Sequence, residues 1–125
     1  MSASEQAIDL ARAAVSGALD KKATHVVAID VSAQLPLADI FVIASASNER
    51  QVAAIVDEVE DRVRAAGGRA LRREGGREDR WVLIDFGDIV VHVQHEQERV
   101  FYQLERLWRD CPTLDLGLDE AAEGH

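Results

Sequence analysis

Residues 81–92 read Trp-Val-Leu-Ile-Asp-Phe-Gly-Asp-Ile-Val-Val-His, which predicts two short strands joined by a tight turn. Gly87-Asp88 suits a two-residue hairpin loop because glycine accepts a positive φ without penalty. A loop of this length fixes which residues face each other across the two strands. Six apolar side chains then share one face, in the pairs Phe86 with Ile89, Ile84 with Val91 and Val82 with Val93. We expect this face to lie in the core.

The opposite face of the same hairpin has a different character. Its expected pairs are Asp85 with Val90, Leu83 with His92 and Trp81 with Gln94. A tryptophan, an aspartate and a histidine on one side of a strand pair are unusual for a core, so they indicate a surface that a partner contacts. The alternative is a mixed solvent face, with Trp81 packed under a helix and His92 as a partly buried, hydrogen-bonded histidine.

The rest of the chain predicts helices and strands around this hairpin. Apolar periodicity and β-branched runs predict a helix over residues 4–20, strands over 26–31 and 39–45, a helix that runs to about residue 66, a short strand over 69–74 and a last helix over 96–108. This order predicts an α/β fold with a mixed five-stranded sheet packed with helices.

Local patterns give the helix ends and two ion pairs. The first helix has Ser4, or Ser2 together with Glu5, as its candidate N-cap, and the second has Asn48 or Ser47. On the second helix, Glu58–Arg62 and Glu60–Arg64 have the i,i+4 spacing of ion pairs on a wet face.

Length and charge bound the class of protein. The 125 residues predict one domain over 1–111, followed by an acidic tail over 112–125 that we expect to be disordered. The formal charge of −9 argues against general nucleic-acid binding and fits a basic protein partner. The alternative is that the acidic charge serves only to keep the protein soluble. The five arginines between residues 69 and 80 are offset by three acids, which favours a solvated edge strand over a binding patch.

We expect a cytoplasmic location. The lone Cys111 cannot form an internal disulfide, which fits a reducing compartment. No secretion signal is evident, and no apolar run is long enough to cross a membrane.

An enzyme is the main alternative. Asp30, Asp39, Asp85 and Asp88 lie at or near expected strand ends, where carboxylates could hold Mg²⁺ for phosphoryl or nucleotidyl transfer. The only candidate phosphate turn, Ser45-Ala46-Ser47, lacks the Gly-Ser pair of such transferases. His92 and His95 form a weak metal motif, so we expect neither a metal nor a cofactor.

Four stretches of the chain resemble the ribosomal silencing factor family, also called Iojap, and the resemblance covers roughly residues 4–110. The stretches are Ala38–Ser45, Arg50–Val52, Trp81–Val93 and Phe101–Trp108. The resemblance implies a nucleotidyltransferase-like fold without transfer activity. It also implies a translation repressor that binds a large-subunit ribosomal protein at the subunit interface, blocks joining of the small subunit and lowers translation when nutrients are short.

The resemblance also assigns expected site residues. By matching position, Trp81 and Tyr102 would contact the partner, and Asp85, Asp88, His92 and Glu105 belong to the same motifs. The implied partner is a basic ribosomal protein, without a membrane and without specific nucleic-acid recognition. A homodimer is compatible with this role, and a structural homodimer that acts only through self-association is the second alternative.

Overall fold

The computed structural model describes residues 4–33, 38–75, 81–97, 109, 111–114 and 116. Seven elements lie in this part of the chain: α1 (Glu5–Asp20), β1 (His25–Asp30), β2 (Ile40–Ala46), α2 (Glu49–Ala65), β3 (Arg72–Glu74), β4 (Trp81–Asp85) and β5 (Ile89–His95). Each predicted element in the described ranges is present, and β3 is shorter than expected. Of the helix expected over 96–108, only residues 96 and 97 are described, and they form a turn.

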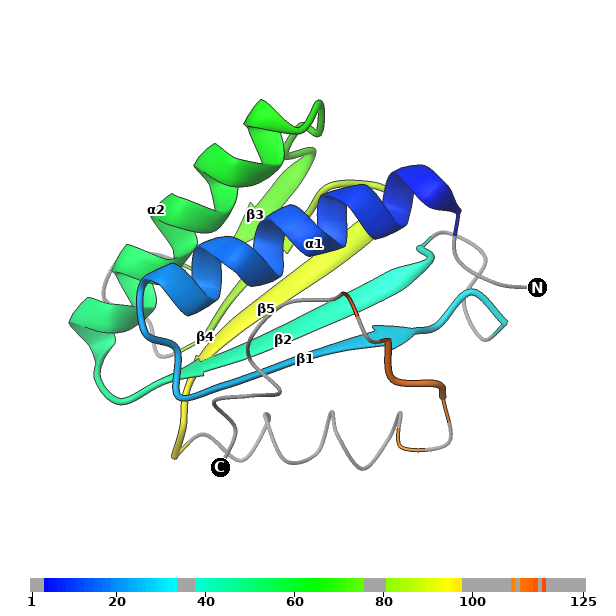
Figure 1. Ribbon diagram of the computed structural model, residues 1–125. Helices are drawn as coiled ribbons and strands as arrows, with labels where there is room; N and C mark the ends of the chain where they lie inside the picture. Colours follow the sequence, from blue (N-terminus) through cyan, green and yellow to red (C-terminus); the bar gives the residue numbers. More distant parts are fainter. Residues whose placement is uncertain are drawn as a thin grey trace.

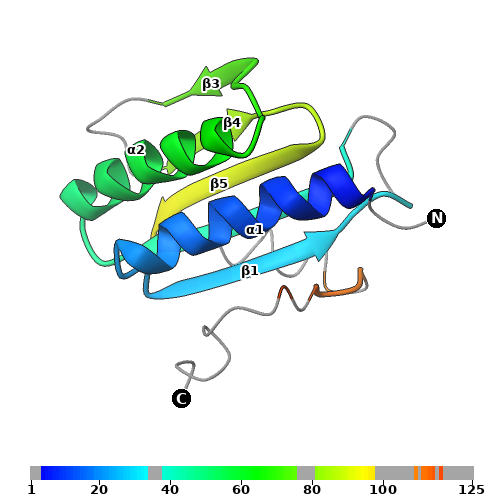
Figure 2. The same cartoon turned by 45° about the horizontal axis from the view of Figure 1, so that its top comes forward.

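The strands form one sheet in the order β1-β2-β5-β4-β3. The central pair β2 and β5 is parallel, and the other neighbouring pairs are antiparallel. Helices α1 and α2 lie side by side on one face of this sheet (Figures 1 and 2). The predicted α/β fold with a mixed five-stranded sheet is therefore confirmed.

The β4–β5 hairpin has the register that its two-residue loop predicted. Every facing pair agrees, from Trp81 with Gln94 to Asp85 with Val90, and the Phe86 backbone N–H donates to the Ile89 carbonyl at 2.9 Å. Gly87 has a φ of 91°, which an L side chain rarely adopts. All six side chains of the expected core face are buried in one cluster with α1 and α2.

Side chains from the loops cap both helices. The Ser4 hydroxyl accepts from the Ala7 N–H at 3.1 Å, and Asn48 Oδ1 accepts from the Gln51 N–H at 2.8 Å. Gln51 Oε1 in turn accepts from the backbone N–H of Ser47 at 2.8 Å. Ser4 and Asn48 are therefore the caps among the candidates that the sequence offered.

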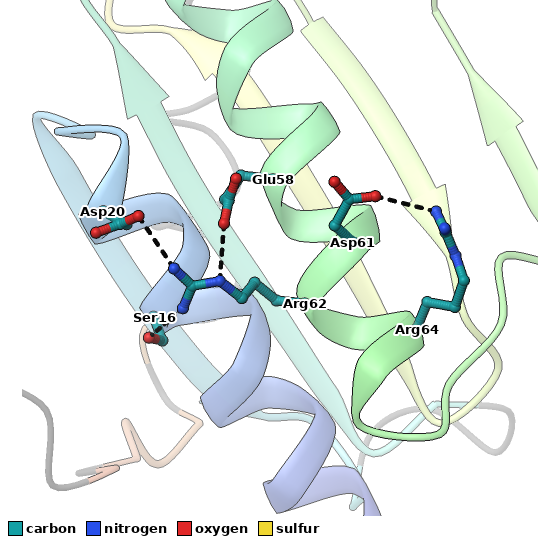
Figure 3. A network of polar contacts seen from close by, with 6 residues as sticks. All are labelled: Ser16, Asp20, Glu58, Asp61, Arg62 and Arg64. Carbon is teal, nitrogen blue, oxygen red and sulfur yellow. Dashed lines mark hydrogen bonds and ion pairs between the residues drawn. The ribbon is translucent and has the colours of Figure 1, made fainter.

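One of the two predicted ion pairs on α2 forms, and it belongs to a larger network (Figure 3). Arg62 donates to Glu58 at 2.8 Å and also reaches α1, where it donates to Ser16 and Asp20 at 3.0 Å each. This single guanidinium therefore joins the two helices.

The other predicted pair, Glu60–Arg64, is wrong. Arg64 pairs with Asp61 at 3.2 Å, and the Glu60 carboxylate accepts from Arg73 of β3 at 3.1 Å. Arg73 lies opposite Ile84, whose side chain faces the helices, so the strand register brings its guanidinium to α2.

The expectation of disorder from Pro112 onward is wrong for the described residues of that segment. The Asp30 N–H donates to the Pro112 carbonyl and the Leu114 N–H donates to the Ala28 carbonyl, both at 2.8 Å, and Thr113 bridges Ile29. The cause is that β1 ends the sheet, so its outer backbone groups need partners. Figure 1 shows this segment beside β1.

Leu116 then enters the main core, where its side chain is 4% exposed. Its carbonyl accepts from Arg12 Nε of α1 at 3.0 Å. The predicted boundary between residues 111 and 112 is therefore no boundary in the packing. Within the described part of the chain, no helix is long and apolar enough to cross a membrane.

Candidate partner-binding face

The candidate site lies on the sheet face opposite α1 and α2. Strand pairing arranges its residues in lines that run across β1, β2, β5 and β4: His25, Ser45, Gln94 and Trp81; then Val27, Ile43, His92 and Leu83; then Ile29, Phe41, Val90 and Asp85. Because side chains alternate along a strand, these residues point away from the two helices. His92 therefore stands on a central strand, and Trp81 stands at one corner.

Three rings cross the central strands of this face, and we call Phe41, His92 and Trp81 the aromatic row. The Phe41 and His92 ring centroids are 5.1 Å apart with the planes tilted by 47°. The Trp81 and His92 centroids are 5.9 Å apart with the planes nearly parallel, at 14°. His92 is 4% exposed and Trp81 is 38% exposed, whereas Phe41 is half-buried, so the middle ring of the row is the buried one.

A hydrogen bond joins Trp81 and His92, two of the expected site residues on this hairpin. Trp81 Nε1 donates to His92 Nδ1 at 3.2 Å. An imidazole that accepts at Nδ1 is neutral and carries its proton on Nε2. Burial acts in the same direction, because it disfavours the charged ring and lowers the pKa of His92 to about 4. His92 is therefore a neutral hydrogen-bond acceptor at physiological pH.

The remaining polar atoms of this region lack partners. His92 Nε2 and both side-chain polar atoms of Gln94 are buried, and none has a hydrogen-bond partner among the described residues. Their environment contrasts with that of Ser45, whose hydroxyl lies 2.9 Å from the Thr24 hydroxyl. Unpaired polar groups in an interior reduce stability.

The two expected acids of the hairpin stand apart from Trp81. Asp85 Oδ1 accepts from the Gly87 N–H at 2.8 Å, which holds the turn. Asp88 is exposed, and its backbone carbonyl accepts from the N–H of Asp39 at 2.8 Å. The strand separates Asp85 from Trp81 by roughly 13 Å, at about 3.3 Å per residue. The structure therefore brings Trp81 and His92 into contact and places Asp85 and Asp88 at the turn of the hairpin, away from them.

Two expected contact residues, Tyr102 and Glu105, lie outside the described residues, so their contact roles stay predictions. Phe41 was not among the expected site residues. The sequence feature that could have indicated it is that Phe41 is the aromatic residue of a largely aliphatic strand. The register of β2 against β5 was needed to place it beside His92.

Two of the strand-end acids that an enzyme would need accept hydrogen bonds from backbone N–H groups. Asp30 Oδ1 accepts from the Ser32 N–H at 3.0 Å, and Asp39 Oδ2 accepts from the Ser4 N–H at 2.9 Å. Among the described residues, no three or more His, Cys, Asp or Glu side chains gather in a way that suits a metal ion. His92 and His95 do not converge either, since residues three apart on a strand face opposite sides, and His95 Nδ1 accepts from the Gln97 N–H.

Comparison with known proteins decides the family. The model of the family described as "Ribosomal silencing factor during starvation" matches residues 4–125. The chain belongs to this family. The family match confirms the resemblance seen in the sequence, and it extends past Pro112, in agreement with the packing of Leu116.

Several bacterial relatives in the family are similar along most of their length. The ribosomal silencing factor RsfS of Halalkalibacterium halodurans is 44% identical over 108 residues, which cover 86% of this chain and 92% of that protein. The factor of Bacillus subtilis is 43% identical over 97 residues, covering 78% of this chain and 82% of that protein. A crystal structure from Bacillus halodurans superposes with a TM-score of 0.72 at 43% identity, covering 82% of this chain and 93% of that one. The nucleotidyltransferase-like label stays a prediction.

Proposed function

We propose that this protein represses translation by binding the large ribosomal subunit at the surface where the small subunit docks. The partner within the large subunit is a basic ribosomal protein. The action is steric, so joining of the two subunits fails while the factor is bound. The observation that carries this proposal is an exposed tryptophan that is hydrogen-bonded to His92 of the sheet, in a chain of the ribosomal silencing factor family.

The surface chemistry around Trp81 supports a protein partner. Among the described residues, the exposed large apolar side chains are Trp81 and Leu71. Tryptophan is enriched at the centres of protein interfaces, where it contributes large contact area at a small entropic cost. The formal charge of −9 favours a basic partner, because opposite charge speeds encounter.

A steric action is also supported by the hydrogen bonds of the strand-end aspartates, which are local and structural. Asp30 and Asp85 hold the backbone of nearby turns, and Asp39 holds the N-terminus of α1. These contacts account for three of the four strand-end carboxylates through local structure, without a chemical step.

A subunit reassociation assay tests the proposal. Purified bacterial small and large subunits are mixed at a magnesium concentration that allows joining, with and without this protein. We expect saturating protein to reduce the joined particle and to co-sediment with the large subunit alone. Trp81→Ala serves as the matched control and should require a much higher concentration. Unchanged joining at saturating protein would refute the proposal.

The same experiment separates this function from self-association. A protein that acts only as a homodimer would leave joining unchanged and would sediment without either subunit. Analytical ultracentrifugation of the protein alone gives its oligomeric state, which is a separate question from ribosome binding.

A further inference from the structure

His92 occupies its place at a cost to stability. The residue is almost fully buried between Phe41 and Trp81, yet its Nε2–H has no acceptor in the part of the chain that the structure describes. An apolar side chain of similar size would fill the same position without a buried unpaired donor, whose lost hydration costs stability. Core packing therefore does not account for a histidine at this position, and its hydrogen bond with Trp81 is the remaining candidate.

That contact fixes the one polar atom of the indole. Tryptophan has a single donor, Nε1–H, and no acceptor. Because this donor is used by His92 Nδ1, the part of Trp81 that remains exposed is carbon surface. The nearly parallel stacking of the two rings restricts the same side chain further.

We propose that His92 is a positioning residue for Trp81, and that its Nδ1 holds the indole in the orientation that the partner meets. The inference rests on the proposed function for the identity of the partner. The free protein already holds the Trp81 side chain in its binding orientation, so less side-chain entropy is lost when the partner binds.

The geometry also defines what the partner offers to Trp81. A partner acceptor cannot use the indole N–H without breaking its bond to His92. The partner therefore packs an aliphatic or cationic side chain against the ring, which is a favourable contact for the electron-rich face of an indole.

Two substitutions of nearly equal size separate positioning from packing. His92→Asn keeps an oxygen acceptor close to the place of Nδ1, whereas His92→Leu fills the space without an acceptor. Neither residue carries a ring, so both variants lose stacking equally. The difference between them measures the hydrogen bond to Trp81.

The readouts are affinity for purified large subunits, the indole N–H resonance of Trp81 and the melting temperature. Trp81→Phe assigns the resonance, since the only other tryptophan is Trp108. For His92→Leu we expect an indole proton that exchanges faster with water and roughly fivefold weaker binding, the loss that one neutral hydrogen bond implies. Its melting temperature should equal or exceed that of the wild type. His92→Asn should keep the slow exchange and bind within about twofold of the wild type.

Equal affinities of the two variants, or a protected indole proton in His92→Leu, would overturn the positioning role. A loss of affinity that follows a fall in melting temperature would show a structural role instead. If the wild type itself does not bind large subunits, the proposed function fails, while the indole resonance still decides whether His92 holds Trp81.

Discussion

Trp81 on β4 bonds to His92 on β5, although strand register pairs Trp81 with Gln94 and His92 with Leu83. The contact is therefore diagonal across the hairpin, and long side chains reach such neighbours. The exposed indole therefore packs on the buried His92 ring, and Phe41 of β2 packs against the same ring. This arrangement leads to predictions about binding, acidity and stability.

Replacing Trp81 by alanine should weaken binding to the large subunit by about 2 kcal/mol, as expected of an interface hot spot. The fold should survive, because the core face of the hairpin is the other one. Leu71→Ala is the matched control, since Leu71 is 65% exposed and leads into β3 at the turn end of the hairpin, beside Gly87. Titration with labelled protein gives both affinities, and circular dichroism verifies folding. Equal losses for the two variants would contradict a specific role for Trp81.

Stability should fall as the pH is lowered from about 6.5 to about 4. The pKa of His92 is lowered to about 4 by burial, whereas the unfolded residue titrates near its usual 6.5. In this window the unfolded chain binds the extra proton, so acid favours unfolding. The loss from this one group is roughly 3 kcal/mol between pH 7 and pH 4. Urea unfolding at both pH values should show a smaller loss in His92→Leu, and equal losses would mean that His92 titrates normally.

Deleting residues 113–125 should destabilise the protein by several degrees. The deletion removes the bond from Leu114 to β1 and the buried side chain of Leu116, and emptying a buried leucine site alone costs about 2–5 kcal/mol. A shorter deletion of residues 117–125 keeps the described contacts and serves as the control. Scanning calorimetry should show a larger fall for the longer deletion. Equal melting temperatures would mean that Leu116 contributes nothing to the core.

Arg62→Ala should cost about 1 kcal/mol of stability, because one guanidinium bonds three side chains across α1 and α2. Arg64→Ala is a suitable control, since Arg64 is more exposed and pairs only with Asp61 among the described residues. Chemical denaturation measures both changes. Added salt should reduce the difference, whereas a difference that is independent of salt would point to lost packing of the Arg62 stem.

Binding to the large subunit should weaken as salt concentration rises. An acidic factor that meets a basic protein is attracted over a distance comparable with the Debye length, about 10 Å at 0.1 M salt. Stopped-flow measurements should show that the association rate falls more than the dissociation rate rises. A rate that does not depend on salt would argue against a basic partner.

The hairpin could be predicted from sequence because one short loop fixed all of its pairs. The ordered C-terminal segment was missed, although Leu114 and Leu116 have the alternating spacing of a strand, because so short a run does not reveal that β1 and α1 supply its partners. The Glu60–Arg64 prediction failed because spacing along one helix carries no information about Arg73 on a distant strand. The sequence placed Trp81 and His92 on the correct face. Their bond needed the diagonal geometry of the two strands.

The segment that follows Cys111 also bears on how the protein behaves at high concentration. It bonds to the Ala28 carbonyl and the Asp30 N–H on the outer edge of β1, while the strand at the other edge of the sheet carries the exposed charges of Arg72 and Glu74. A chain cut after Cys111 would offer a bare, partly apolar strand to any similar strand in solution. Proteolysis after Cys111 would then promote aggregation before unfolding, and preparations of this protein should retain residues 112–116.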